Sequence, residues 1–115
     1  MKKILLSSVI VLGLLSLAPS AFAESKSYDS LGKGFARAWT LTDSGGSGSA
    51  TWEVEYGFNK FAIDEDFIHG YHNSKGHTVK LTNGNDTYSD SNSAGKWSRI
   101  DVRHAGQTVY YNFNF

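Results

Sequence analysis

The sequence contains no cysteine, which excludes disulfide bonds and any metal site built on cysteine ligands. Small domains often need such cross-links, because a short chain buries little apolar surface. With 115 residues there is room for one domain, and its stability has to come from packing large side chains. The chain supplies 3 Trp, 6 Tyr and 7 Phe for that purpose. Each aromatic side chain can bury roughly 150–250 Å², so a compact core without covalent cross-links is feasible.

Long apolar runs are also lacking, except for one at the N-terminus. Two lysines, Lys2 and Lys3, precede an apolar run over residues 4–18, and the small-x-small signal Ala21-Phe22-Ala23 follows. The run is shorter than the ~20 residues that span a bilayer, and no stop-transfer charges follow it, so a membrane-anchored form is the less favoured alternative. We expect a signal peptide over residues 1–23, cleaved near Ala23, and a secreted mature chain.

The sequence has no excess of positive charge. The full chain carries 11 Lys and Arg against 11 Asp and Glu. Removing Lys2 and Lys3 leaves 9 cationic against 11 acidic side chains, so the mature chain has a formal charge of −2. Nucleic acids and anionic lipid surfaces select basic proteins, so we expect neither nucleic-acid binding nor membrane insertion of the mature chain.

Alternating apolar and polar residues dominate the second half of the chain and predict an all-β protein. In residues 51–57 the apolar positions are Trp52, Val54 and Tyr56, which places them on one face of a strand. Residues 77–89 predict a hairpin with a type I′ turn at Asn83-Gly84. Residues 96–104 alternate in the same way. The C-terminal segment alternates as well, and we expect it to be a core strand with its aromatic residues buried.

Two regions give weaker signals. Residues 24–47 are predicted to be an N-terminal extension, ending in a flexible Gly/Ser linker at 43–50. Within this extension, residues 35–41 alternate and favour either a loosely attached strand or a mobile amphipathic segment. Residues 58–76 are the least regular. Their acidic group Asp64-Glu65-Asp66 is compatible with a cap on a short helical turn or with an exposed loop.

Motifs for catalysis and metal binding are lacking too. His69, His72 and His77 follow neither the helical HExxH spacing nor that of a zinc finger. Glu53 and Glu55 share one face of a strand instead of flanking a cleft. No GxSxG motif or cysteine nucleophile is present. We therefore expect no enzyme activity, no metal and no cofactor.

Ligand binding is the remaining possibility. Arg99, Arg103 and Lys75 are suited to an anionic group such as a phosphate, because cationic side chains donate charge-assisted hydrogen bonds. The alternative is a charged strand face that serves solubility alone. Exposed rings such as Trp97 or Tyr110 can stack on sugars, although core packing is the commoner use of aromatic side chains.

Several short motifs together resemble the lactococcin 972 family of bacteriocins. They are the run YHNSKGHTV at 71–79, AGKW at 94–97 and YYNF at 110–113, with TW at 51–52 and YG at 56–57 ahead of them. The resemblance covers about residues 48–115 and the layout of an exported precursor. Their order and spacing make the match more specific than any single motif does. We therefore treat residues 48–115 as a lactococcin 972-like domain.

The resemblance implies a small antiparallel β-sandwich secreted by Gram-positive bacteria. It implies inhibition of closely related bacteria by binding the lipid-linked wall precursor lipid II, which blocks septum and wall synthesis without pores. Producers of such proteins typically carry a dedicated immunity and ABC transporter system. The alternative is a secreted, non-toxic module that binds wall glycans or proteins, and a homo-oligomer is left open. The candidate ligand-binding residues are Tyr71, Lys75, His77, Trp97, Arg99 and Arg103.

Overall fold

A computed structural model describes residues 23–115, which form eight strands and no helix. The predicted signal peptide, except for Ala23, lies outside the described residues. Within the described part of the chain, no helix is long and apolar enough to cross a membrane. The strands are β1 (Ser25–Asp29), β2 (Trp39–Ser47), β3 (Ala50–Asn59), β4 (Glu65–His72), β5 (His77–Asn83), β6 (Asp86–Asn92), β7 (Trp97–Arg103) and β8 (Tyr110–Asn114).

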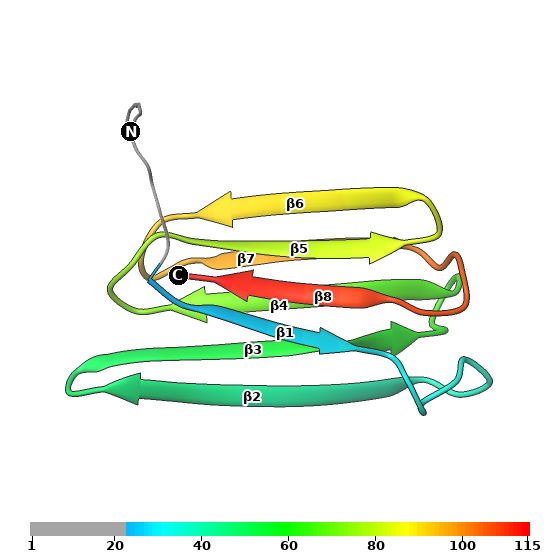
Figure 1. Cartoon of the computed structure of the whole chain (residues 1–115), viewed down its shortest axis with the longest axis horizontal. Helices are drawn as coiled ribbons and strands as arrows, with labels where there is room; N and C mark the ends of the chain where they lie inside the picture. Colours follow the sequence, from blue (N-terminus) through cyan, green and yellow to red (C-terminus); the bar gives the residue numbers. More distant parts are fainter. Residues whose placement is uncertain (1–22) are drawn as a thin grey trace.

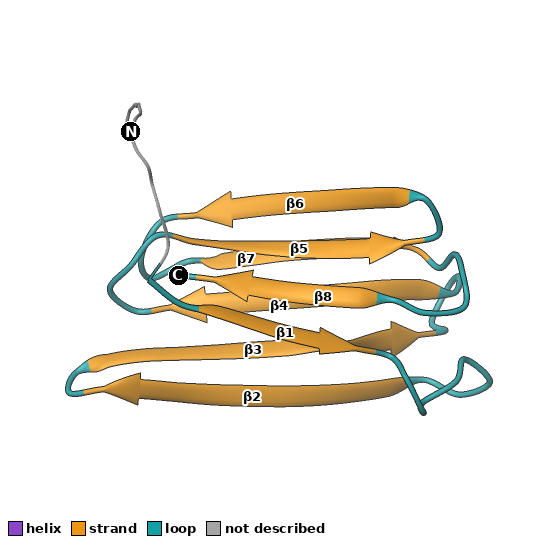
Figure 2. Ribbon diagram, in the orientation of Figure 1, coloured by secondary structure: helices purple, strands orange, loops and turns teal. Residues whose placement is uncertain are grey.

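The strands form two antiparallel sheets that stack face to face (Figures 1 and 2). One sheet has the order β1-β8-β5-β6 and the other has the order β2-β3-β4-β7. The predicted all-β sandwich is therefore confirmed. Each sheet keeps one face dry against the other and one face in water, which is why alternation was visible in the sequence.

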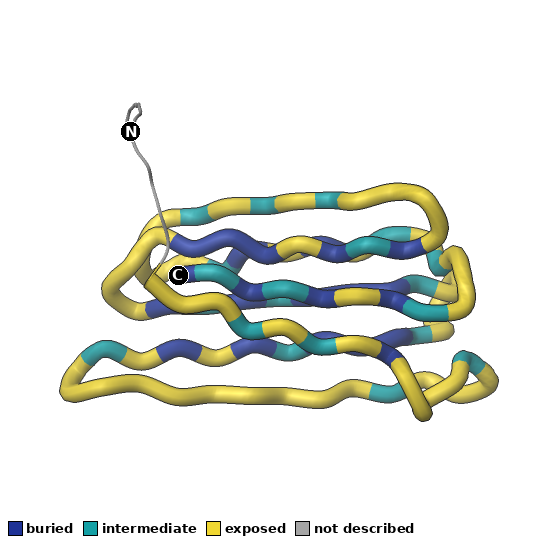
Figure 3. The backbone as a smooth tube through the Cα atoms, in the orientation of Figure 1, coloured by how far each residue is buried: buried dark blue, intermediate teal, exposed yellow. Residues whose placement is uncertain are grey.

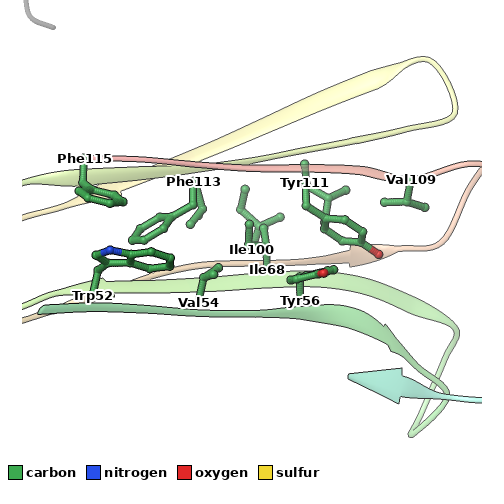
Figure 4. Close-up of a cluster of buried hydrophobic side chains, with 11 residues drawn as sticks. Trp52, Val54, Tyr56, Ile68, Ile100, Val109, Tyr111, Phe113 and Phe115 are labelled. Atoms are coloured by element: carbon green, nitrogen blue, oxygen red, sulfur yellow. The ribbon is translucent and has the colours of Figure 1, made fainter. Parts of the chain in front are cut away.

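The core lies between the sheets and is rich in aromatic rings (Figure 4). On β3 the side chains of Trp52, Val54 and Tyr56 point inward, as the alternation predicts. The C-terminal segment contributes its alternate residues to the same core, and all four are at most 4% exposed. These residues are Val109, Tyr111, Phe113 and Phe115. The C-terminal segment is thus a buried strand, paired with β1 on one side and β5 on the other.

The predicted flexible linker at 43–50 is wrong. Residues 43–47 belong to β2, which pairs with β3 along its whole length, and the hairpin turns at Gly48 with a φ of 63°. Glycine is needed here because of close packing. A Cβ at position 45 would lie 2.8 Å from Cζ2 of Trp52, so only glycine leaves room for the indole. The boundary predicted between residues 47 and 48 therefore falls inside the β2–β3 hairpin.

The extension 24–47 is part of the sandwich. Its first segment forms β1, which pairs with β8, and its second forms β2. The predicted strand at 35–41 begins only at Trp39. Residues from this region also pack against the core, among them Tyr28, which stacks on Tyr56 with ring centroids 4.4 Å apart. The extension thus supplies one edge strand to each sheet (Figure 3).

Two further expectations need correction. The hairpin turn between β5 and β6 consists of Gly84 and Asn85, one residue later than predicted, because Asn83 still pairs with Asp86. The acidic group at 64–66 forms neither a helical turn nor a fully exposed loop. Asp66 is completely buried within β4, where the Asn83 amide donates to it at 2.9 Å and His104 Nδ1 lies 2.9 Å from both carboxylate oxygens. Leaving a buried acceptor without its partners typically costs at least ~1–3 kcal/mol.

Candidate functional site

Three of the six predicted ligand residues lie together on the outer face of the β2-β3-β4-β7 sheet. The register of β4 and β7 places Tyr71 opposite Trp97, and Arg99 two residues further along β7. The two rings pack with centroids 5.4 Å apart, and the Arg99 guanidinium lies 5.6 Å from the Trp97 ring centroid. We call Tyr71, Trp97 and Arg99 the aromatic–arginine face.

The charges around Arg99 limit what this face can bind. His69 lies beside it, with Nδ1 2.9 Å from Glu55 Oε2 and Nε2 2.9 Å from Asp101 Oδ1. The Arg99 guanidinium lies 3.3 Å from the same Nδ1. Both carboxylates are bonded to the histidine that the arginine contacts, and their negative charge opposes an incoming anion. The aromatic–arginine face is a poor anion site.

The remaining three predicted residues lie elsewhere. Arg103 is at the far end of β7 opposite Glu65, six residues from Trp97 and so roughly 20 Å away along the strand. His77 is 1% exposed and its Nδ1 lies 2.9 Å from the carbonyl oxygen of Lys75, so it cannot touch an external ligand and instead helps to hold the β4–β5 loop. Lys75 on this loop is exposed and borders a cleft.

This cleft, of about 530 Å³, opens where the edge strands β1 and β2 of the two sheets face each other. We call it the β1–β2 cleft. Its floor is Trp52 and Phe115, whose ring centroids are 5.3 Å apart at one end of the core (Figure 4). Gly45 and Gly46 of β2 form one wall. Its volume lies in the range of small-molecule sites.

Two ammonium groups stand above the floor of the cleft. The Lys26 Nζ lies 5.3 Å from the Trp52 ring centroid, and the Lys75 Nζ lies 5.9 Å from that of Phe115. Neither lysine forms an ion pair with another residue in the range 23–115. An anion could therefore draw both ammonium groups without first breaking a salt bridge. The aromatic–arginine face offers one such cation, Arg99, beside a histidine that is bonded to two carboxylates.

Two acidic residues, Glu24 and Asp43, also line the cleft, and the carboxylate of Asp43 is already hydrogen-bonded. Asp43 of β2 accepts a hydrogen bond from the Tyr28 hydroxyl at 2.7 Å, and its other oxygen accepts the Ser44 N–H at 2.9 Å. Burial, followed by this hydrogen bond to Asp43, raises the pKa of Tyr28 well above its ordinary value, so the hydroxyl stays protonated. The bond joins the two edge strands beside the cleft.

His72 also lines the cleft and is held neutral. Its Nδ1 accepts the backbone N–H groups of Ser74 and Lys75, both at 3.0 Å, so the ring carries its proton on Nε2. Burial lowers the pKa of His72, and the charge of Lys75 lowers it further. The ring therefore fixes the start of the loop that carries Lys75. Its centroid lies 5.0 Å from that of Phe115.

The predicted residues thus include one member of the cleft, Lys75, and miss the others. Lys26 lies in a segment that reads as a polar lead-in, although the alternation of Lys26 and Tyr28 with Ser25 and Ser27 is a weak strand signal. Trp52 was predicted as core alone. No group of three or more His, Asp or Glu side chains able to hold a metal ion occurs within residues 23–115.

Comparison of the chain with protein-family models, with curated proteins and with solved structures gives no match.

Proposed function

We propose that the protein is a secreted bacteriocin that inhibits related Gram-positive bacteria by holding the wall precursor lipid II in the β1–β2 cleft. The observation that carries this proposal is the pair of ammonium groups, Lys26 and Lys75, above an aromatic floor. The pyrophosphate of lipid II offers the anion for the lysines, and the rings of Trp52 and Phe115, only 8% and 4% exposed, form a rigid floor beneath it. The motifs of residues 48–115 support the same assignment.

The fold supports a mechanism without pores. The aromatic residues of the C-terminal segment, which would be the natural membrane-inserting element, are buried in the core. Exposing them would break the β8 pairing with β1 and β5. Inhibition would therefore come from withholding the precursor from the enzymes that build the wall.

The test compares two double variants with the same loss of charge. Lys26→Ala/Lys75→Ala removes both cleft ammonium groups, and Lys33→Ala/Lys96→Ala removes two exposed lysines outside the cleft. Binding to purified lipid II and inhibition of related strains are measured for both. If each lysine contributes about 1 kcal/mol of binding free energy, the cleft variant should bind lipid II at least tenfold more weakly. The control variant should match the unchanged protein.

Three outcomes would overturn the proposal. Equal losses in both double variants would show a nonspecific charge effect. Prompt loss of membrane potential in treated cells would show pore formation. Binding to purified wall sacculi with no inhibition of any related strain would favour the non-toxic wall-binding module instead.

A further inference from the structure

The outer face of the β1-β8-β5-β6 sheet carries a second, separate groove of about 300 Å³. Residues of all four strands line it. The strand register arranges them in two rows across the sheet. The first row is Asp29, Tyr110, Thr82 and Thr87, and the second is Ser27, Asn112 and Lys80. Neighbours within a row are about 4.8 Å apart and the rows are about 6.8 Å apart, which are ordinary sheet spacings.

Tyr110 gives the groove an aromatic platform. Its side chain is 54% exposed, whereas Val109 and Tyr111 on either side of it point into the core. An exposed ring beside ordered polar groups is the arrangement that stacks on the apolar face of a sugar.

The polar groups around Tyr110 are held in place by hydrogen bonds. The Asn112 amide nitrogen donates to Ser25 Oγ at 3.0 Å and to Ser27 Oγ at 2.9 Å. Asp29 Oδ1 accepts the backbone N–H of Leu31 at 3.0 Å. These bonds orient the amide oxygen of Asn112 and the second oxygen of Asp29 as acceptors before any ligand arrives. Such preorganisation lowers the entropy cost of binding.

The charge of the groove selects for a neutral ligand. Among residues 23–115, the charged residues that line it are Asp29 and Lys80, and their formal charges cancel. The hydroxyl groups of a sugar both donate and accept hydrogen bonds. They therefore match a carboxylate, an amide oxygen and an ammonium group placed side by side.

We infer that this groove binds a neutral glycan chain, with one sugar ring stacked on Tyr110 and its hydroxyls bonded to Asp29, Lys80 and Asn112. The inference goes beyond the proposed function and does not depend on it, because the groove and the β1–β2 cleft share no lining residue. The cleft would take the anionic precursor, and the groove would hold an uncharged glycan of the wall.

The experiment titrates the full mature chain with neutral β-1,4-linked tetramers of glucose and of N-acetylglucosamine, using calorimetry and amide NMR shifts. Tyr110→Ala should weaken binding of the preferred tetramer at least fivefold, and Tyr110→Phe, which keeps the ring, should stay within threefold of the unchanged protein. Phe61→Ala is the matched control, because Phe61 is 96% exposed on the β3–β4 loop away from both sites. Unchanged melting temperatures confirm that the variants are folded.

The expected chemical-shift changes fall on the amides of β1, β8 and β5 that border the groove. The amides around the floor of the β1–β2 cleft should keep their shifts. No binding of either tetramer at millimolar concentration would overturn the inference. Equal affinities for Tyr110→Ala and the unchanged protein would also overturn it, as would loss of binding in Phe61→Ala. The variant Lys26→Ala/Lys75→Ala separates the two proposals, because it should keep its affinity for the glycan while its affinity for lipid II falls.

Discussion

At the scale of single residues, His72 connects the interior to the β1–β2 cleft. Its ring packs beside Phe115, and its Nδ1 accepts two backbone N–H groups of the loop that carries Lys75. A protonated ring would lose this acceptor, so the loop geometry depends on the neutral form. The pKa of His72 lies below its ordinary value of 6.5, mainly because of burial.

This pKa shift predicts a dependence of stability on pH. As the pH falls below about 6.5, the unfolded His72 binds a proton while the folded ring stays neutral, so the unfolded state is favoured. The stabilisation is complete above about pH 6.5 and is lost as the pH falls toward the folded pKa, by about 1.4 kcal/mol per pH unit at most. His72→Gln keeps an acceptor but does not titrate, so it should lose less stability in urea unfolding between pH 7.5 and 5.5.

The other three histidines are present in both proteins, so any pH dependence that they cause cancels when the unchanged protein is compared with His72→Gln. Equal losses of unfolding free energy in the unchanged protein and in His72→Gln over this pH range would contradict the prediction.

At the scale of elements, the β2–β3 hairpin shows why a glycine-rich stretch is part of a sheet. The indole of Trp52 occupies the space that a side chain on Gly45 would need. The same close approach forms a wall of the cleft. The glycines of this strand are required by packing. In the sequence alone, the same stretch has the Gly/Ser composition of a flexible linker.

Gly45→Ala should therefore destabilise the protein by about 1–3 kcal/mol, the usual cost of overpacking a filled site. Ser44→Ala, one residue away on an exposed position of the same strand, should change stability by less than about 0.5 kcal/mol. Denaturant unfolding of both variants measures the difference. Wild-type stability in Gly45→Ala would show that Trp52 can move aside freely.

The elements also show what could be predicted from the sequence. The strands β3, β7 and β8 were predictable because each has one wet and one dry face, so the residue types alternate. β2 is exposed along almost its whole length, and only its first residues, 39–41, belong to the stretch that alternates. The β1–β2 cleft depends on two edge strands meeting across the sandwich, a contact between sheets that local patterns do not record. Of its residues, only Lys75 was therefore among the predicted ligand residues.

At the scale of the whole molecule, the segment before residue 48 completes both sheets. Without it, β8 loses its partner β1 and β3 loses its partner β2. The core also loses the packing of Tyr28, Phe35 and Trp39. Two newly exposed sheet edges with unpaired backbone groups favour association between chains.

A chain that starts at residue 48 should therefore fail to fold cooperatively and should aggregate. The chain that starts at residue 24 should remain folded. Thermal unfolding followed by near-UV circular dichroism, together with size-exclusion chromatography, distinguishes the two. A monomeric, cooperatively melting 48–115 fragment would contradict the prediction and would restore the boundary that the sequence suggested.

The strand β1 serves both proposed sites by simple alternation. Lys26 faces the β1–β2 cleft, whereas Ser27 and Asp29 line the glycan groove on the other side of the same strand. A protease reaches exposed edge segments before it reaches the interior, and β1 is only five residues long. A single cut within β1 would therefore remove residues of both proposed binding sites at once.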